Sequence, residues 1–253
     1  MSHIHIDVEH LSFSYGKTAP VLRDLTFHAK EHEAVGIIGA NGVGKSTLLK
    51  LLVGLELPTE GSIRIEEIPM EPGTLPKIRE KVGYVFQDAD SQLFMSTVGE
   101  DVAFAPRNYG LPEAEVKTRV SDALSRVGIS HLKDKRTYQL SGGEKKLASI
   151  ATILSMTPDI ILMDEPSAAL DPRNRRGLIH ILNEFEHLKI ITSHDLDFIL
   201  DTCGRVILMN DGQIIADGEA EGILTDRRLL EENGLELPLS LSRLHAADIL
   251  SHS

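Results

Sequence analysis

A glycine-rich segment between two apolar patterns constrains the fold of this chain most. Residues 34–38 read Ala-Val-Gly-Ile-Ile, which predicts a buried strand, and the apolar spacing from Lys45 to about Leu55 predicts a helix. Between them the chain reads Gly39-Ala40-Asn41-Gly42-Val43-Gly44-Lys45-Ser46. Glycines at this spacing let backbone N–H groups converge on phosphate oxygens at the start of a helix. The segment therefore predicts an α/β protein with a phosphate-binding loop.

The last two residues of this segment carry the expected chemistry of the loop. Lys45 stands where its ammonium group can reach the terminal phosphates of a nucleotide, and the Ser46 hydroxyl is a ligand for Mg²⁺. The plain alternative is a glycine turn that binds nothing. Because the segment lies between a predicted strand and a predicted helix, as phosphate binding requires, the binding loop is the favoured interpretation.

Two adjacent carboxylates follow a second apolar run. Residues 160–163 read Ile-Ile-Leu-Met and precede Asp164 and Glu165. This order places both acids at the carboxyl edge of the predicted sheet, where α/β proteins bind their ligands. We expect Asp164 to orient Mg²⁺ and Glu165 to accept a proton from an attacking water. Without the glycine loop, a helix N-cap would explain the pair better.

Composition limits the class of protein. The 253 residues have a net charge of −12, the wrong sign for binding nucleic acid through the overall field. Hydrophobic residues make up 42% of the chain and aromatic residues only 4%, which favours the aliphatic core of a parallel sheet. The single cysteine, Cys203, is predicted to be a small buried residue. The apolar runs fall far short of the ~20 residues that span a membrane.

Short apolar runs predict the remaining strands. They lie at residues 62–65, 82–86, 160–163, 189–192, 205–209 and 213–216. The last two flank Asp211-Gly212 and predict a hairpin. At the N-terminus, Ile4, Ile6 and Val8 alternate with polar residues, which predicts a half-buried strand. His3 and His5 would then lie on its solvent face, an interpretation preferred over a metal site because two ligands are too few.

Helical spacing dominates the middle of the chain. One helix is predicted to begin at Pro112 and end near Val127, and Ser141 is predicted to cap another. We therefore expect a discontinuous nucleotide-binding core (1–88 and 157–218), an inserted helical subdomain (89–156) and a C-terminal helical appendage (219–253). The eleven histidines are scattered, including His245 and His252, and form no ligand cluster in the sequence.

The segment Leu140-Ser141-Gly142-Gly143-Glu144 resembles the signature motif of ATP-binding-cassette (ABC) ATPases. The other landmarks of that family follow in order: Phe13-Ser14-Tyr15-Gly16, Gln87, Ser167-Ala168-Ala169-Leu170-Asp171 and His194. The resemblance covers residues 4–218. It implies a P-loop NTPase core with a mostly parallel sheet, an antiparallel N-terminal β region and an inserted helical subdomain.

By this resemblance, ATP and Mg²⁺ bind at a site shared between two chains, where the signature of one chain contacts the γ-phosphate held by the glycine loop of the other. The implied catalytic residues are Glu165, His194, Gln87 and Lys45. The implied metal ligands are Ser46, Gln87 and Asp164. The implied nucleotide contacts are Tyr15, Gly39, Ala40, Asn41, Gly42, Val43, Gly44, Lys45, Ser46, Thr47, Ser141, Gly142, Gly143, Glu144 and Asp171.

The resemblance also implies partners: a second copy or a paralogous ATPase in a head-to-tail dimer, and integral membrane transport subunits at the cytoplasmic face of the cell membrane. Three other kinds of ABC ATPase are disfavoured. Chromosome-structure and DNA-repair ATPases insert long coiled coils, whereas Ser46 and Leu140 are only 94 residues apart. Translation factors carry two cassettes, whereas this chain has one. A regulatory cassette that only binds ATP commonly lacks the catalytic acid or histidine, whereas Glu165 and His194 are present.

A subfamily is also indicated. The segment 86–94, Phe-Gln-Asp-Ala-Asp-Ser-Gln-Leu-Phe, resembles energy-coupling-factor (ECF) importers of the cobalt and nickel type, although Ala89 stands where that subfamily usually has proline. Segments 192–198, 210–218 and 233–239 resemble the same type. An ECF importer of a vitamin or another substrate is the alternative, and a non-transport ABC ATPase is a more distant one.

Overall fold

The computed structural model of the chain describes residues 4–242. They fall into two compact units, one formed by residues 4–78 and 188–242 and the other by residues 79–187. We call the first the glycine-loop unit and the second the signature unit, after the motif that each contains. Each is described by itself below.

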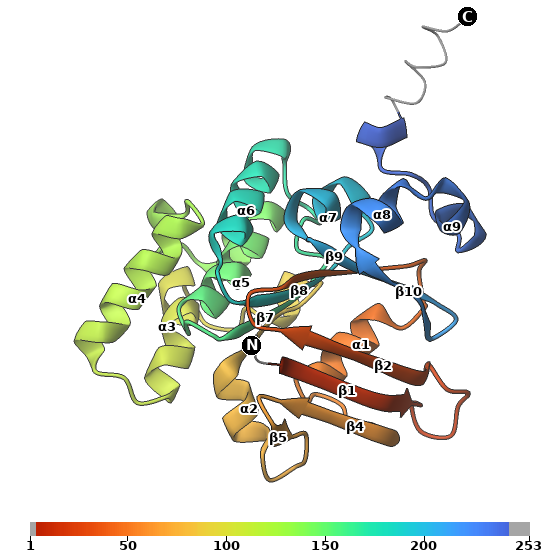
Figure 1. Cartoon of the computed structure of the whole chain (residues 1–253). Coiled ribbons are helices and arrows are strands. Elements are labelled where there is room, and N and C mark those ends of the chain that lie inside the picture. The colour runs from red at the N-terminus through yellow and green to blue at the C-terminus, as the bar shows by residue number, and fades with distance from the viewer. Residues whose placement is uncertain (1–3, 243–253) are drawn as a thin grey trace, which may run out of the picture. The chain divides into compact units, whose positions relative to one another are not determined.

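The glycine-loop unit begins with an antiparallel sheet of order β2-β1-β4-β5, drawn in red to orange in Figure 1. Its strands are β1 (Ile4–Phe13), β2 (Leu22–Lys30), β4 (Glu60–Ile65) and β5 (Ile68–Pro69). Ile6, Val8 and Leu11 of β1 are completely buried, so one face of this sheet packs into the core. The antiparallel N-terminal β region is confirmed.

The unit also has a group of mostly parallel strands around β3. These strands are β3 (Ala34–Ile38), β8 (Leu188–Thr192), β9 (Arg205–Asn210) and β10 (Gln213–Glu219). β3 pairs in parallel with both β8 and β9, while β9 and β10 form the predicted antiparallel hairpin. The helices are α1 (Lys45–Leu52), α2 (Leu75–Lys81, which continues into the next unit), α7 (Leu196–Thr202), α8 (Ala220–Thr225) and α9 (Arg227–Glu232).

The signature unit inserts helices between two parallel strands. The strands are β6 (Val82–Val85) and β7 (Ile160–Asp164), with Val85 opposite Met163. The α-helices between these strands are α3 (Val98–Asn108), α4 (Glu113–Arg126) and α5 (Gly142–Leu154), and α6 (Pro172–Glu184) follows β7. Three 3₁₀ turns complete the described elements of the unit: η1 (Ala89–Ser91), η2 (Ser130–Leu132) and η3 (Thr137–Gln139). The predicted α/β fold with an inserted helical part is confirmed.

Individual elements differ from the sequence-based expectation. α1 ends at Leu52 instead of Leu55, because Gly54 takes a left-handed conformation with φ of 67°. β2, β5, α2, α6 and α7 were not predicted. Within the predicted C-terminal appendage, the structure has the helices α8 and α9, while residues 243–253, including His245 and His252, lie outside the described residues. The predicted domain boundaries at 88, 156 and 218 stay predictions.

The solvent-exposed placement of His5 was wrong. Its exposed fraction is only 7%, and its imidazole lies 3.4 Å from a carboxylate oxygen of Glu66 and 4.0 Å from one of Glu31. Alternation along β1 placed this side chain on the outer face, but carboxylates from after β4 and after β2 cover it. His3 lies outside the described residues.

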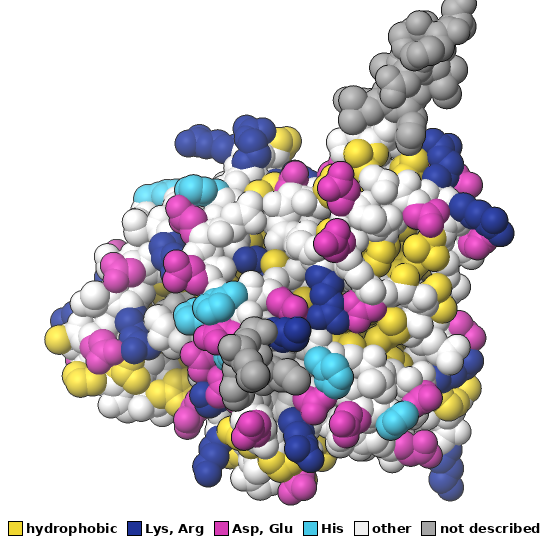
Figure 2. All heavy atoms as spheres, in the orientation of Figure 1, with side chains coloured by type: hydrophobic (Ala, Val, Ile, Leu, Met, Phe, Trp, Pro, Cys, Tyr) yellow, Lys and Arg dark blue, Asp and Glu magenta, His cyan; other side chains and the backbone are white. Residues whose placement is uncertain are grey.

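On the face of the molecule shown in Figure 2, acidic and basic side chains are interspersed. Among the described residues, no helix is long and apolar enough to cross a membrane.

Cys203 is 6% exposed, and burial raises the pKa of its thiol to about 11, so its predicted role as a small buried residue is confirmed.

Candidate nucleotide site

The glycine loop follows the buried strand β3 and opens α1. Gly39 has φ of 151°, and a side chain there would meet the Met209 carbonyl. Gly44, the N-cap of α1, has φ of 104°, and a side chain there would meet Leu22. Both positions need glycine, because other residues rarely adopt such φ values and these side chains would have no room. The loop therefore stays close to the sheet.

The start of α1 is suited to an anion. No side chain caps its first turn, and that turn contains no acidic residue. The first N–H groups of a helix have no partner within the helix and carry partial positive charge. Gly42, with φ of 81°, has no atom within 4 Å of the place where a side chain would begin, so a ligand can approach the backbone there.

Lys45 lies under this loop. Its side chain is 7% exposed, and its ammonium group donates hydrogen bonds to the carbonyl oxygens of Gly39 at 2.7 Å and Ala40 at 3.0 Å. These bonds hold the ammonium group next to the first two residues of the loop. Ser46 is half-buried beside it, and Thr47 is buried with its hydroxyl 3.4 Å from that of Tyr15.

Tyr15 and His194 complete the predicted ligands of this unit. Tyr15 is 40% exposed, and its ring meets Phe13 edge-on with 4.8 Å between centroids, which leaves part of it available for stacking on a base. His194 is exposed and follows β8. Because β8 runs parallel and next to β3, His194 and the glycine loop lie at the same edge of the sheet.

The signature unit has a second polar edge. Gln87 follows β6 and is exposed, while Asp164 ends the neighbouring parallel strand β7. Asp164 is 3% exposed and Glu165 is 9% exposed. Glu165 has φ of 48°, a left-handed conformation that is uncommon outside glycine and often marks functional sites. The structure thus brings the predicted metal ligands Gln87 and Asp164 to the same edge as the predicted base.

The signature segment forms the start of α5, as predicted. Ser141 accepts a hydrogen bond from the Glu144 backbone, and the Glu144 carboxylate accepts one from the Ser141 backbone at 2.7 Å, a complete capping box. This bond and the ion pair with Lys135 lower the pKa of Glu144. The Glu144 carboxylate therefore already stabilises the helix start. Its predicted contact with nucleotide, and that of Gly142, stay predictions.

The segment after Glu165 lies against the signature. A side chain at Gly143 would lie 3.2 Å from the Ala169 carbonyl. Asp171 ends this segment as the N-cap of α6 and accepts hydrogen bonds from the backbone of Asn174 and Arg173, which lower its pKa. Its predicted contact across a dimer stays a prediction.

These residues fit ATP and Mg²⁺. The glycine loop has N–H donors and a cation suited to phosphates, and the predicted metal ligands, Ser46 in the glycine-loop unit and Gln87 and Asp164 in the signature unit, have the oxygen atoms that Mg²⁺ prefers. A glycine loop between a buried strand and a helix is the mark of a P-loop nucleotide-binding protein.

Lys146 is a residue that the sequence did not single out. It is 2% exposed, and its ammonium group donates hydrogen bonds to the carbonyl oxygens of Phe86 and Gln87. Burial lowers its pKa, although the negative charges of Asp164, Asp88 and Glu165 oppose that shift. A lysine within an otherwise apolar helix face was the available signal, because such a residue is rarely buried without a partner.

Comparison with known proteins identifies the family. The ABC transporter family matches residues 22–168, more than half of the chain. A protein of Geobacter sulfurreducens, whose name assigns it provisionally to ABC transporter ATP-binding proteins, is 50% identical over 95% of this chain and 97% of its own length. The energy-coupling factor transporter ATP-binding protein EcfA of Methanothermobacter thermautotrophicus is 43% identical over 96% of this chain and 80% of its own.

Solved structures agree. CbiO1 of Clostridium perfringens, described as part of the ABC transporter complex CbiONQ, has a TM-score of 0.81 and 36% identity, and the match covers 96% of this chain and 99% of that one. The ATP-binding cassette MJ0796, solved as a dimer bound to ADP and phosphate, has a TM-score of 0.78 and 26% identity over 85% of this chain and 98% of its own. The chain belongs to the ABC transporter family and is an ABC ATPase, whose substrate and metal are ATP and Mg²⁺.

Proposed function

We propose that the chain is the ATP-hydrolysing subunit of an ECF importer for cobalt or nickel ions. It works at the cytoplasmic face of the cell membrane as a head-to-tail dimer with itself or a paralogue, attached to integral membrane subunits. The observation that carries this proposal is the match to EcfA and CbiO1 over almost the whole chain, on a fold that contains a complete glycine loop and the Asp164-Glu165 pair.

The roles of the residues follow from their chemistry. Glu165 takes the proton of the attacking water, and Lys45, Ser141 and His194 donate hydrogen bonds or positive charge to the γ-phosphate oxygens. Ser46, Asp164 and Gln87 would hold Mg²⁺, which would supply charge neutralisation at the phosphates. The Tyr15 ring stacks on adenine. Backbone groups of the glycine loop and the signature enclose the phosphates from two chains.

Two exposed aromatic residues support a protein partner for the signature unit. Phe94 is 65% exposed and Phe104 is 42% exposed, and their rings meet edge-on with 4.8 Å between centroids. Exposed aromatic clusters are typical of protein interfaces. Phe94 also ends the segment that resembles ECF importers, so we assign the docking of a membrane subunit to this place.

A cobalt or nickel substrate is the finest level of the proposal. It is supported by the subfamily resemblance of segments 86–94, 192–198, 210–218 and 233–239 and by the likeness to CbiO1. Among the described residues, no group of three or more metal-binding side chains occurs, so capture of the ion is assigned to a membrane component. ECF import of a vitamin is the second candidate, because the name EcfA specifies no substrate.

Glu165→Gln tests the chemical role. The amide keeps the shape of the side chain but cannot accept the proton, so we expect the hydrolysis rate to fall by about 10²- to 10⁴-fold while ATP binding is kept. Phosphate release measures the rate, and a fluorescent ATP analogue measures binding. Light scattering should show a closed dimer accumulating with ATP. Hydrolysis at the wild-type rate would refute the assignment of Glu165 as the base.

Uptake tests the substrate. Membrane subunits that co-purify with the chain are first identified and then produced together with it. The complex is placed in vesicles, with ATP on the side of the membrane that carries the ATPase. We expect ATP-dependent accumulation of radioactive cobalt or nickel, and no accumulation with Glu165→Gln. Accumulation of a vitamin instead of either metal would favour the second candidate, and the ATPase function would stand.

A further inference from the structure

The loop that carries Gln87 is attached to the signature helix at several points. Gln92 donates hydrogen bonds to the Ser149 carbonyl at 2.7 Å and the Thr152 hydroxyl at 2.8 Å, both in α5. Its side-chain oxygen accepts a third from the Phe86 backbone at 3.1 Å. Lys145, also in α5, forms an ion pair with Asp90. These contacts hold the start and the end of the loop on α5.

Lys146 makes the attachment nearest to the Gln87 side chain. Its ammonium group donates to the Gln87 carbonyl at 2.7 Å and to the Phe86 carbonyl at 2.9 Å. Two adjacent carbonyls held by one cation fix the direction of the backbone from which the Gln87 amide projects. The Lys145 and Gln92 contacts reach residues on either side, not Gln87 itself.

Lysine is an unusual residue at the buried position 146 of α5. The side chain is 2% exposed and lies in α5 next to the buried residues Leu147 and Ala148. Burying an ammonium group is costly unless polar or charged groups compensate. Here two carbonyl oxygens accept hydrogen bonds from the ammonium group, and the carboxylates of Asp164, Asp88 and Glu165 provide favourable charge. The groups that compensate for burial of the Lys146 charge therefore belong to the loop that carries Gln87 and to the segment that contains the predicted base.

Lys146 is also rigidly joined to the signature. It lies in the same helix as Ser141, whose capping box forms the first turn of α5. A shift of that helix start therefore moves Lys146, and through it the Gln87 backbone. A helix transmits such a shift because hydrogen bonds from each N–H to the carbonyl four residues earlier tie its successive turns together.

We propose that Lys146 is a positioning residue that couples the signature helix to Gln87 and sets the orientation of the Gln87 side chain during ATP hydrolysis. The inference rests on the proposed role of Gln87 at the metal and the attacking water. Lys146 acts through the Gln87 backbone, so its removal leaves the nucleotide contacts of the glycine loop in place.

A double-mutant cycle on the full chain tests this coupling. Four proteins are compared: wild type, Lys146→Met, Gln87→Ala and the double variant. Misplacing a catalytic group by about 1 Å can cost ~10²-fold in rate, so we expect Lys146→Met to lower kcat by roughly 10- to 100-fold. The KM for ATP should change by less than about threefold, since uniform binding is unaffected. In the Gln87→Ala background, Lys146→Met should cost less than about twofold, because residues that act through one another are not additive.

Two further variants separate positioning from folding. Lys146→Gln retains one donor that can reach a loop carbonyl, and we expect it to recover part of the kcat that Lys146→Met loses. It also serves if Lys146→Met does not fold, as judged by its thermal unfolding midpoint. Lys117→Met makes the same change at an exposed lysine of α4 and should leave kcat unchanged.

The outcomes are distinct. If Lys146→Met lowers kcat by the same factor in both backgrounds, or leaves it at the wild-type value, the coupling is overturned while the role of Gln87 stands. If Gln87→Ala itself hydrolyses ATP at the wild-type rate, the proposed role of Gln87 fails and the coupling fails with it. A loss confined to the background that retains Gln87 supports the inference.

Discussion

Asp101 is a carboxylate whose surroundings favour its neutral form. It is 3% exposed, and one oxygen accepts hydrogen bonds from the backbone of Phe94 and Met95, both at 3.1 Å. Among the described residues, the other oxygen has no hydrogen-bond partner. Burial raises the pKa of Asp101 above its ordinary value of 3.8, against the effect of the two backbone bonds.

The raised pKa of Asp101 predicts a pH dependence of stability. The folded state binds the proton more tightly than the unfolded state, so its stability falls as the pH rises from about 3.8 through the folded-state pKa, and remains lower above it. Asp101→Asn does not titrate and keeps an oxygen for the two backbone donors. We therefore expect the free energy of unfolding of Asp101→Asn, relative to that of the wild type, to increase as the pH rises through this window. Urea unfolding at each pH measures it.

The control for this prediction is Asp122→Asn, which makes the same chemical change at an exposed position of α4. Its stability difference from the wild type gives the effect of the substitution apart from burial. A difference between wild type and Asp101→Asn that stays constant from pH 4 to pH 7 would contradict the prediction.

At the scale of single residues, sequence reasoning succeeds where local chemistry decides. The Gly39–Ser46 motif, the Asp164-Glu165 pair and the Ser141 cap depend on neighbours in the chain, so they were readable. His5 and Lys146 depend on partners that are distant in sequence: Glu66 for the first and the Phe86 carbonyl for the second. Periodicity contains no information about such partners, so their surroundings could not be predicted.

At the scale of elements, two glycines make opposite demands. Gly83 lies in β6, and a side chain there would meet Ile153 of α5 and Pro158. Gly177 lies in α6, where a side chain would meet no atom within 4 Å. We expect Gly83→Ala to lower the free energy of unfolding by about 1–3 kcal/mol through overpacking. Gly177→Ala should raise it by about 0.5–1 kcal/mol because alanine favours the helix.

Urea unfolding of both variants checks the sign as well as the size. The two substitutions add the same methyl group, so each serves as the control for the other. Equal effects in one direction would show that the close packing of β6 on α5 does not determine the cost.

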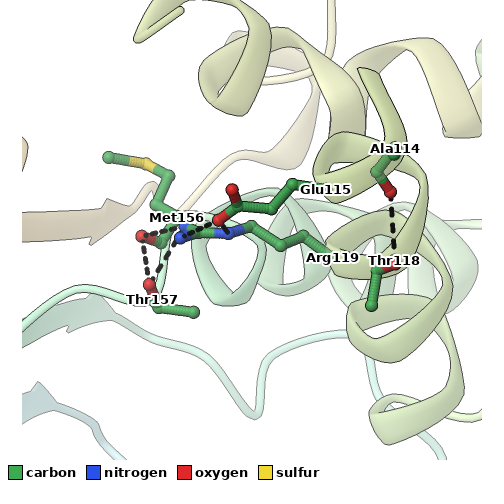
Figure 3. A network of polar contacts seen from close by, with 6 residues as sticks. All are labelled: Ala114, Glu115, Thr118, Arg119, Met156 and Thr157. Carbon is green, nitrogen blue, oxygen red and sulfur yellow. Dashed lines mark hydrogen bonds and ion pairs between the residues drawn. The ribbon is translucent and has the colours of Figure 1, made fainter. Parts of the chain in front are cut away.

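Arg119 joins α4 to the end of α5 (Figure 3). Its guanidinium group donates to the Met156 carbonyl at 3.2 Å, to the Thr157 hydroxyl at 3.1 Å and to Glu115 at 2.8 Å. Arg119→Met leaves the Met156 carbonyl without this donor. We expect a loss of about 1–2 kcal/mol in the free energy of unfolding.

Arg107→Met is the matched control for Arg119→Met. Arg107 also pairs with a glutamate, Glu113, but both side chains are about half exposed, at 49% and 53%. Pairs of this kind contribute little, so the loss should stay below about 0.5 kcal/mol. A similar loss in both variants would mean that the contact with the end of α5 adds nothing.

Elements were predicted well where their pattern was regular. β7, β8 and β9 contain short apolar runs and lie within one residue of their predicted bounds. β2 was missed although Leu25 to Lys30 alternates cleanly between buried and exposed positions. The pairing of β2 with β1 is irregular near Asp24, which has φ of 52°. This irregularity interrupts the alternation at the start of the strand, although the alternation in its second half was sufficient to predict it.

At the scale of the whole molecule, each unit contains only part of the predicted ligand set. The glycine-loop unit provides Lys45, Ser46 and His194, and the signature unit provides Gln87, Glu165 and the Ser141 segment. The signature is proposed to serve the nucleotide of a second chain, as in the proposed head-to-tail dimer. Hydrolysis would then depend on association of two chains, which sequence reasoning could state only by resemblance.

Mixing two inactive variants tests this dependence. Lys45→Ala removes the cation of the glycine loop, and Ser141→Arg blocks the signature, so each variant alone has no intact site. In a mixed dimer, the loop of the Ser141→Arg chain meets the signature of the Lys45→Ala chain, and one site is whole. At equal concentrations half of the dimers are mixed, so we expect about a quarter of the wild-type phosphate release. Sites built within one chain would recover nothing, because neither variant contains both groups.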